Sequence, residues 1–130
     1  MKIFEEFIQE ISLETDFLKK LKMVSDKIQD EIIEKNPEKN IKEAKFIINN
    51  NFLVYPLSEN KFVALEKEIQ ENFFISYIEI TDKKTFLRLK TWDIKYKGKT
   101  ENEKIKNIFK IFFEVLIILD PSIKTKKEII

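Results

Sequence analysis

The sequence contains few of the side chains that usually carry enzyme chemistry. There is no His and no Cys among its 130 residues. The chain therefore lacks thiol nucleophiles, thiolate metal ligands and disulfides, and it lacks the commonest general base. The one glycine, Gly98, lies in Lys97-Gly98-Lys99, so the glycine-rich loops that bind nucleotide phosphates are excluded as well. We expect no metal site, no cofactor and no enzyme activity.

Carboxylates are the remaining candidates for acid–base or metal chemistry. The local groups are Glu5 with Glu6, Glu66 with Glu68, Glu101 with Glu103, and the helical series Asp26, Asp30 and Glu34. Two catalytic acids must face each other across a cleft, and neighbours in sequence do not indicate that arrangement. The helical series alternates with lysines, which is typical of a solvated face. We expect all of these acids to lie on solvated helix or strand faces.

Charge is distributed unevenly along a chain whose formal net charge is +1. Residues 83–99 carry seven basic side chains and one acid, which gives a local charge of +6. Residues 1–82 carry 11 lysines and 17 acids, which gives −6. The basic segment 83–99 is therefore the main candidate for an interaction surface with an acidic protein or with nucleic acid.

Aromatic residues lie among the charges of the basic segment, at alternate positions. Because side chains alternate between the faces of a strand, a regular strand would place on one face the set Phe86, Arg88, Lys90, Trp92, Ile94 and Tyr96. Arg, Trp and Tyr are enriched at binding hot spots. We predict a partner-binding face made of Arg88, Lys90, Trp92 and Tyr96, with Lys95 and Lys97 beside them.

A bulge would give this strand a different arrangement. In that alternative Leu87 and Leu89 face the core, and an extra residue near Thr91 shifts the alternation. The core residues after the bulge would then be Trp92, Ile94 and Tyr96, and the charged side chains would point to water. The sequence leaves both arrangements open.

Hydrophobic spacing predicts a helical first part of the chain, residues 1–50. Apolar residues recur every three or four positions over residues 2–35, with a break near Ser12 to Thr15, both of which are suitable N-caps. Asn36-Pro37-Glu38 is typical of a helix start. Because glycine is absent there, we expect Asn49-Asn50-Asn51 to end this short helix in a left-handed conformation.

The hydrophobic period changes at Phe52. Runs rich in β-branched and aromatic residues predict four strands, at residues 52–57, 61–69, 73–81 and 85–97. The connections are short and polar, so we expect a four-stranded antiparallel meander. Pro56 cannot donate a ladder hydrogen bond, which favours an edge position for the first strand.

The residues after the basic segment 83–99 predict a C-terminal helix. Thr100 and Glu103 form a capping box, and Asp120-Pro121 predicts a stop after about Leu119. The helix carries more apolar residues than one buried stripe uses, among them Ile111, Phe113, Ile117 and Ile118. It is expected to pack on the sheet as a central helix. A homodimer or partner surface is the alternative.

These features predict one α+β domain over residues 1–130, with N-terminal helices, the meander at 52–97, the helix at 100–119 and a tail at 121–130. The acidic N-terminal residues do not resemble a signal peptide. The longest apolar stretch, Ile105–Leu119, contains charges and is short for a membrane span. We therefore expect a cytoplasmic protein that has no membrane contact.

Elimination favours a non-enzymatic protein-binding module as the function. A small inhibitor, immunity protein or anti-defence protein fits the size, and the richness in Lys, Ile, Asn and Phe indicates the genome of a low-GC bacterium or phage. The first alternative is a nucleic-acid-binding protein that uses the basic strand 83–99. The second is a small-molecule or nucleotide-binding domain.

Overall fold

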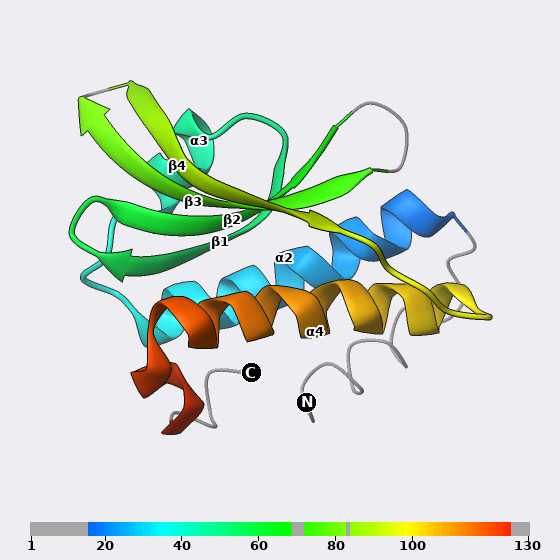
Figure 1. Ribbon diagram of the computed structural model, residues 1–130. Helices are drawn as coiled ribbons and strands as arrows, with labels where there is room; N and C mark the ends of the chain where they lie inside the picture. The colour runs from blue at the N-terminus through cyan, green and yellow to red at the C-terminus, as the bar shows by residue number, and fades with distance from the viewer. Residues whose placement is uncertain (1–15, 69–71, 83, 126–130) are drawn as a thin grey trace. The chain divides into compact units, whose positions relative to one another are not determined.

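The computed structural model describes residues 16–68, 72–82 and 84–125. Within these ranges, two helices precede four strands, and a helix and a short 3₁₀ turn follow them (Figure 1). The elements are α2 Phe17–Lys35, α3 Ile41–Ile47, β1 Asn51–Ser58, β2 Lys61–Lys67, β3 Phe73–Asp82, β4 Thr85–Ile94, α4 Glu101–Leu119 and η1 Pro121–Thr125. This order confirms the predicted α+β class. None of the described helices is long and apolar enough to cross a membrane.

The contacts divide the chain into two compact units. The first contains most of α2 together with α4 and η1, and the second contains the end of α2, α3 and the sheet. The expectation of one domain, and of α4 packing on the sheet, stays a prediction. Each unit is described below by itself.

Helix α2 begins after Asp16, whose Oδ1 accepts a hydrogen bond from the backbone N–H of Lys19 at 3.0 Å. Asp16 is therefore the N-cap, because its carboxylate satisfies an amide of the first turn. The predicted caps Ser12 and Thr15 lie outside the described residues, as does the predicted helical stretch before them. The buried stripe of α2 consists of Leu21, Val24, Ile28 and Ile32.

Polar and aromatic contacts join α2 to the chain around α4. Lys20 is only 5% exposed, and its Nζ donates a hydrogen bond of 2.8 Å to Oδ1 of Asn102. Phe17 stacks on Tyr96, with 5.9 Å between the ring centroids. The buried ammonium keeps a hydrogen-bond partner, as burial of a charged group requires.

The predicted capping box of α4 is present. The Oγ1 of Thr100 accepts from the N–H of Glu103 at 3.1 Å, and Oε2 of Glu103 accepts from the N–H of Lys99 at 2.7 Å. The helix ends at Leu119, before Asp120, as predicted. Its buried residues are Ile105, Ile108, Phe109, Phe112, Phe113, Val115 and Leu116.

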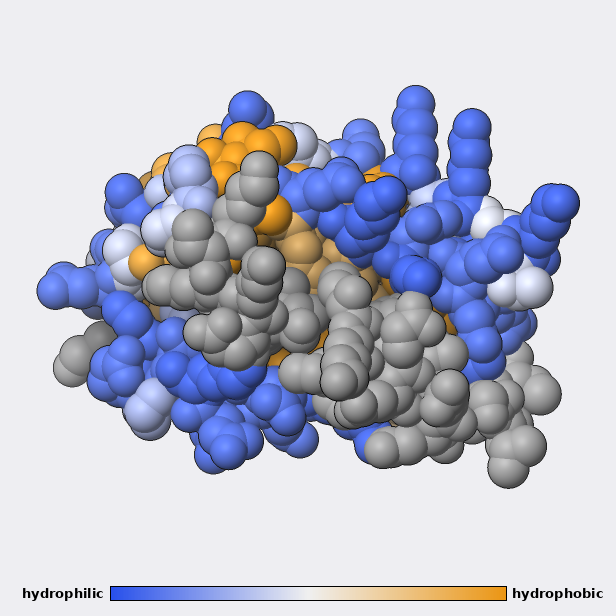
Figure 2. Space-filling model, turned by 90° about the horizontal axis from the view of Figure 1, so that it is seen from below, coloured by the Kyte–Doolittle hydropathy of each residue, from blue (hydrophilic) through white to orange (hydrophobic). Residues whose placement is uncertain are grey.

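The apolar residues of α4 that exceed one buried stripe differ in their exposure to solvent. Phe113 is buried, Ile111 and Ile117 are half-buried, and Ile118 is 70% exposed. The predicted use of this helix in a homodimer stays a prediction. Among the coloured residues on the face shown in Figure 2, hydrophilic side chains predominate and hydrophobic areas are smaller. The exposed large hydrophobic residues within the described ranges are Met23, Phe46, Leu87, Leu89 and Ile118.

Gly98 passes close to the first turn of α4. A Cβ added there would lie 2.7 Å from the backbone nitrogen of Lys104 and 2.9 Å from the Cβ of Glu103. We expect Gly98→Ala to lower the free energy of unfolding by about 1–3 kcal/mol through overpacking, measured by urea denaturation. The control Lys99→Ala alters an exposed side chain and should stay within about 0.5 kcal/mol. Equal midpoints for Gly98→Ala and the unmodified protein would contradict this prediction.

Helix α3 begins later than predicted. Residues 37–39 form a turn, in which the N–H of Lys39 bonds to the carbonyl of Asn36 at 3.1 Å, and the helix starts at Ile41. Residues 37–39, which were expected to be the first turn of the helix, thus form a separate turn, a structure that Pro also favours. After the helix, Asn50 has φ 59°, which confirms that Asn takes the left-handed position expected of a glycine substitute.

The four strands form the predicted antiparallel meander in the order β1-β2-β3-β4. β1 is an edge strand, which confirms the inference from Pro56. The strands β2 and β4 end at Lys67 and Ile94, earlier than predicted, and the predicted strand residue Ile69 lies outside the described ranges.

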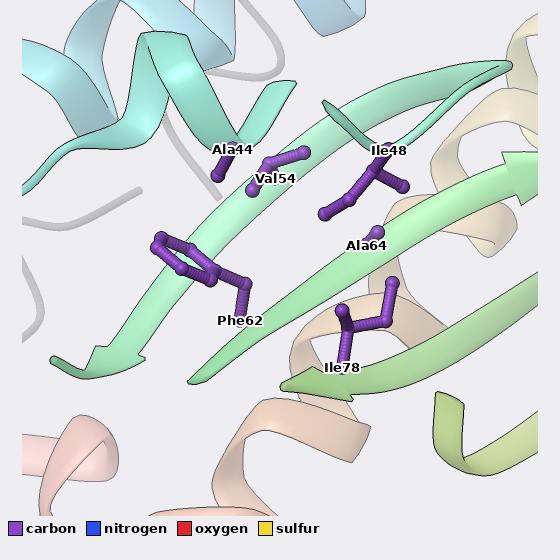
Figure 3. Close-up of a cluster of buried hydrophobic side chains, with 6 residues drawn as sticks. All are labelled: Ala44, Ile48, Val54, Phe62, Ala64 and Ile78. Atoms are coloured by element: carbon purple, nitrogen blue, oxygen red, sulfur yellow. The ribbon is translucent and has the colours of Figure 1, made fainter. Parts of the chain in front are cut away.

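A hydrophobic cluster joins α3 to one face of the sheet, here called the α3 face. The helix and its C-cap contribute Ala44 and Ile48, and the strands contribute Val54, Phe62, Ala64 and Ile78 (Figure 3). Ile80 and Phe86 pack against this cluster. Beyond the cluster, the α3 face carries the polar side chains of Glu66, Ser76 and Arg88 together with the ring of Phe74.

Candidate functional site

Strand β4 forms the second edge of the sheet (Figure 1). Only Ile94 is buried among its residues, Phe86 and Trp92 are half-buried, and the rest are exposed. Leu87 is 55% exposed and Leu89 is 48% exposed. The alternative that placed these two leucines in the core is therefore wrong. Among the described residues, β4 has a neighbouring strand on one side only, and its side chains are largely open to solvent.

The pairing of β4 with β3 is irregular in the middle. Lys90 pairs with Tyr77, and Arg88 pairs with Ile78, so Leu89 is an extra residue that bulges from the ladder. Paired residues share a face of the sheet, whereas the successive residues Tyr77 and Ile78 point to opposite faces. Arg88 and Lys90 therefore lie on opposite faces.

The predicted single ladder of basic and aromatic residues is therefore wrong. The alternative arrangement placed a bulge near Thr91. The strand does contain a bulge, and it lies at Leu89, two positions before Thr91. It moves Arg88 to the α3 face and leaves Lys90 and Trp92 together on the opposite face, where Nζ of Lys90 lies 5.1 Å from the centroid of the Trp92 ring. Lys95 is exposed just after the end of the strand.

The last two predicted site residues lie beyond β4. Tyr96 is half-buried and stacks on Phe17, as described above, and it belongs with Lys97 to the first unit. The backbone carbonyl of Lys97 accepts a hydrogen bond from Nδ2 of Asn107. Neither residue continues the strand face, because the strand ends at Ile94. Lys83, which was counted in the basic segment, lies outside the described residues.

A partly buried ion pair lies on the α3 face beside the cluster. The Nη2 of Arg88 lies 2.6 Å from Oε1 of Glu66, and Nε lies 3.2 Å from Oε2. The Oγ of Ser76 donates a further hydrogen bond of 2.6 Å to Oε2. Glu66 is 1% exposed, so the expectation of a solvated strand acid is wrong for this residue. In the sequence, the signal for burial of Glu66 was its position directly after the apolar run Phe62–Leu65.

Arg88 is held in place by its surroundings. Its Cζ lies 5.0 Å from the ring centroid of Phe86 and 5.7 Å from that of Phe74. The hydrogen bond to Glu66 raises the pKa of Arg88, partial burial opposes the rise, and the charge of Glu66 adds to it. The guanidinium is therefore cationic at every working pH and has a fixed orientation, while 39% of the side chain stays exposed.

A groove of about 510 Å³ opens beside this pair. Strands β2, β3 and β4 supply most of its lining, and the turn after α3 and the residue after β2 supply the rest. The lining residues are Asn49, Asn50, Glu66, Lys67, Glu68, Phe74, Phe86, Arg88, Thr91 and Asp93. Sequence reasoning missed this groove because its members come from four separate segments.

The described residues contain no group of three or more His, Cys, Asp or Glu side chains that could hold a metal ion. Comparisons with protein-family models, with curated proteins and with solved structures found no match to this chain. The two surfaces defined above, the exposed edge of β4 and the groove over Glu66 and Arg88, are therefore the basis for assigning a function.

Proposed function

We propose that this protein is a non-enzymatic, cytoplasmic protein-binding module that holds an extended acidic segment of its partner along the edge of β4. The observation that carries the proposal is that β4 has a neighbouring strand on one side only within the described residues, and that nearly all of its residues are exposed. A small inhibitor or immunity protein of this kind acts by occupying its partner.

An exposed edge strand offers main-chain hydrogen bonds to a strand from another chain. Leu87 and Leu89 add exposed apolar area along that edge, which a partner can cover. The bulge at Leu89 interrupts the regular pairing of β4. Residues 90–94, which follow the bulge, form the longest regular stretch of this edge. Lys90 and Trp92 lie in this stretch.

The charge of this edge favours an acidic partner. Lys84, Lys90 and Lys95 are exposed on β4 and beside its ends, whereas the charge of Arg88 is matched by Glu66. Complementary charge directs association and excludes partners of the wrong sign. Trp92 is the single tryptophan, and a partner that reaches Lys90 will also approach its ring.

Nucleic acid is the second candidate, favoured by the contact between Lys90 and the Trp92 ring. Single-stranded nucleic acid combines phosphate contacts with bases stacked on aromatic faces. Here Lys90 lies over the ring and Trp92 is half-buried, which leaves less of the aromatic face for a base. The two candidates also differ in salt dependence, which is steep for phosphate contacts.

The test uses labelled extended peptides of about ten residues, the length of a long strand, with alternating Glu and Val or alternating Lys and Val. An oligothymidylate is the third probe, and fluorescence anisotropy is measured with Trp92 emission as a second readout. We expect the acidic peptide to bind, and Lys90→Glu to weaken it by about tenfold or more. Lys42→Glu, an exposed lysine of α3, is the matched control and should leave binding unchanged.

Three outcomes contradict the protein-binding proposal. Equal binding of the acidic and basic peptides would remove charge as a determinant. An effect of Lys42→Glu as large as that of Lys90→Glu would show that net charge, and not the β4 edge, decides. Tight binding of the oligothymidylate alone, lost steeply as salt rises, would assign the edge to nucleic acid.

A further inference from the structure

The groove beside Glu66 and Arg88 presents charges of both signs to solvent. Glu66 is buried and matched by Arg88, but Glu68 and Asp93 are exposed and form no ion pair within the described part of the chain. Lys67 and the exposed portion of Arg88 supply positive charge to the same lining. A ligand with a single charge would meet an uncompensated like charge in this groove.

We propose that this groove binds a small zwitterion of the free α-amino acid type with an apolar side chain. Such a ligand carries a carboxylate for the cationic side and an ammonium for the acidic side of the lining. The bulge places Arg88 on the opposite face from Lys90 and Trp92, so the groove and the side chains proposed to contact the partner lie on different faces of the sheet.

In this proposal, Arg88 binds the carboxylate of the ligand. Its Nε and Nη2 are bonded to Glu66, whereas Nη1 makes no hydrogen bond within the described residues. The buried carboxylate and the two phenylalanine rings fix the guanidinium, so little side-chain entropy is lost when a ligand binds. A charge-assisted hydrogen bond from a preorganised Arg is among the stronger polar contacts available to a protein.

Asp93 and Glu68 provide the complementary contact for the ligand ammonium. Asp93 pairs across the sheet with Phe74, which places its side chain on the α3 face with the ion pair. The half-buried ring of Phe86 offers an apolar surface for the ligand side chain. The volume of about 510 Å³ falls within the range usual for small-molecule sites.

The experiment titrates the full-length protein with L-phenylalanine and follows the backbone amide signals by NMR. Phenylalanine amide, which lacks the carboxylate, and N-acetylphenylalanine, which lacks the ammonium, are the matched probes. We expect saturable shifts at Asn50 and Thr91 with the free amino acid, and dissociation constants about tenfold or more higher for both derivatives. Asp93→Asn should weaken the free amino acid while leaving the fold unchanged, because Asp93 is exposed.

Glu59→Gln, an exposed acid of the β1–β2 turn, is the control and should bind like the unmodified protein. The proposal is overturned if phenylalanine causes no saturable shift in the groove. It is equally overturned if either derivative binds as tightly as the free amino acid, since the groove would then not recognise both charges. These readouts do not depend on the peptide experiment, so the two proposals can fail separately.

Discussion

A chain that ends at Thr100 is expected to be insoluble or to show no cooperative unfolding transition. The truncation removes α4 with its seven buried hydrophobic residues, of which Phe109 and Phe112 are the largest that are fully buried. Burial of one large apolar side chain contributes about 1.5–3 kcal/mol. Several such losses together exceed the roughly 5–15 kcal/mol that holds a domain folded. Circular dichroism during urea titration measures the result.

The control chain ends at Thr125 and keeps α4 with the turn η1 that follows it. It should unfold with the same midpoint as the full chain, because the helix and its cap at Thr100 are intact. A soluble fragment 1–100 with a sigmoidal transition would show that α4 is peripheral to the stability of the chain.

Local signals in the sequence predicted most of the fold. The capping box at Thr100, the stop before Pro121 and the left-handed Asn50 each depend on a few neighbouring residues, so the sequence contains the whole cause. The change to strand spacing at Phe52 and the short polar connections likewise predicted the meander. The late start of α3 was missed because an Asn-Pro pair favours a turn as well as a helix start.

The candidate site was less predictable because it depends on contacts between strands. Alternation along residues 85–97 does not reveal where an extra residue is inserted, and the bulge at Leu89 reverses the face of every residue after it. Glu66 and Arg88 are separated by 22 residues and meet only through the pairing of three strands. That the one arginine lies in the basic segment was visible, but the sequence did not identify its partner.

Replacing Arg88 by Met is expected to lower the free energy of unfolding by about 2–4 kcal/mol. The variant keeps much of the side-chain volume. Among the described residues, it leaves the carboxylate of Glu66, which is 1% exposed, with Ser76 as its one remaining hydrogen-bond donor. Breaking a fully buried pair in this way costs about 3–5 kcal/mol. We expect a smaller loss than for a fully buried pair because 39% of the Arg88 side chain is exposed. Water can therefore partly replace the guanidinium as a partner of Glu66.

A double-variant cycle separates the loss of the pair from the loss of either side chain. The double variant Glu66→Gln with Arg88→Met should recover about half or more of the loss, because a neutral amide tolerates burial better than an unpaired carboxylate. Lys90→Met makes a similar change two positions along the strand, at an exposed side chain, and should cost no more than about 0.5 kcal/mol. If Arg88→Met is no more costly than Lys90→Met, then Glu66 does not need its partner. The fixed guanidinium on which the groove proposal depends would then have no energetic basis.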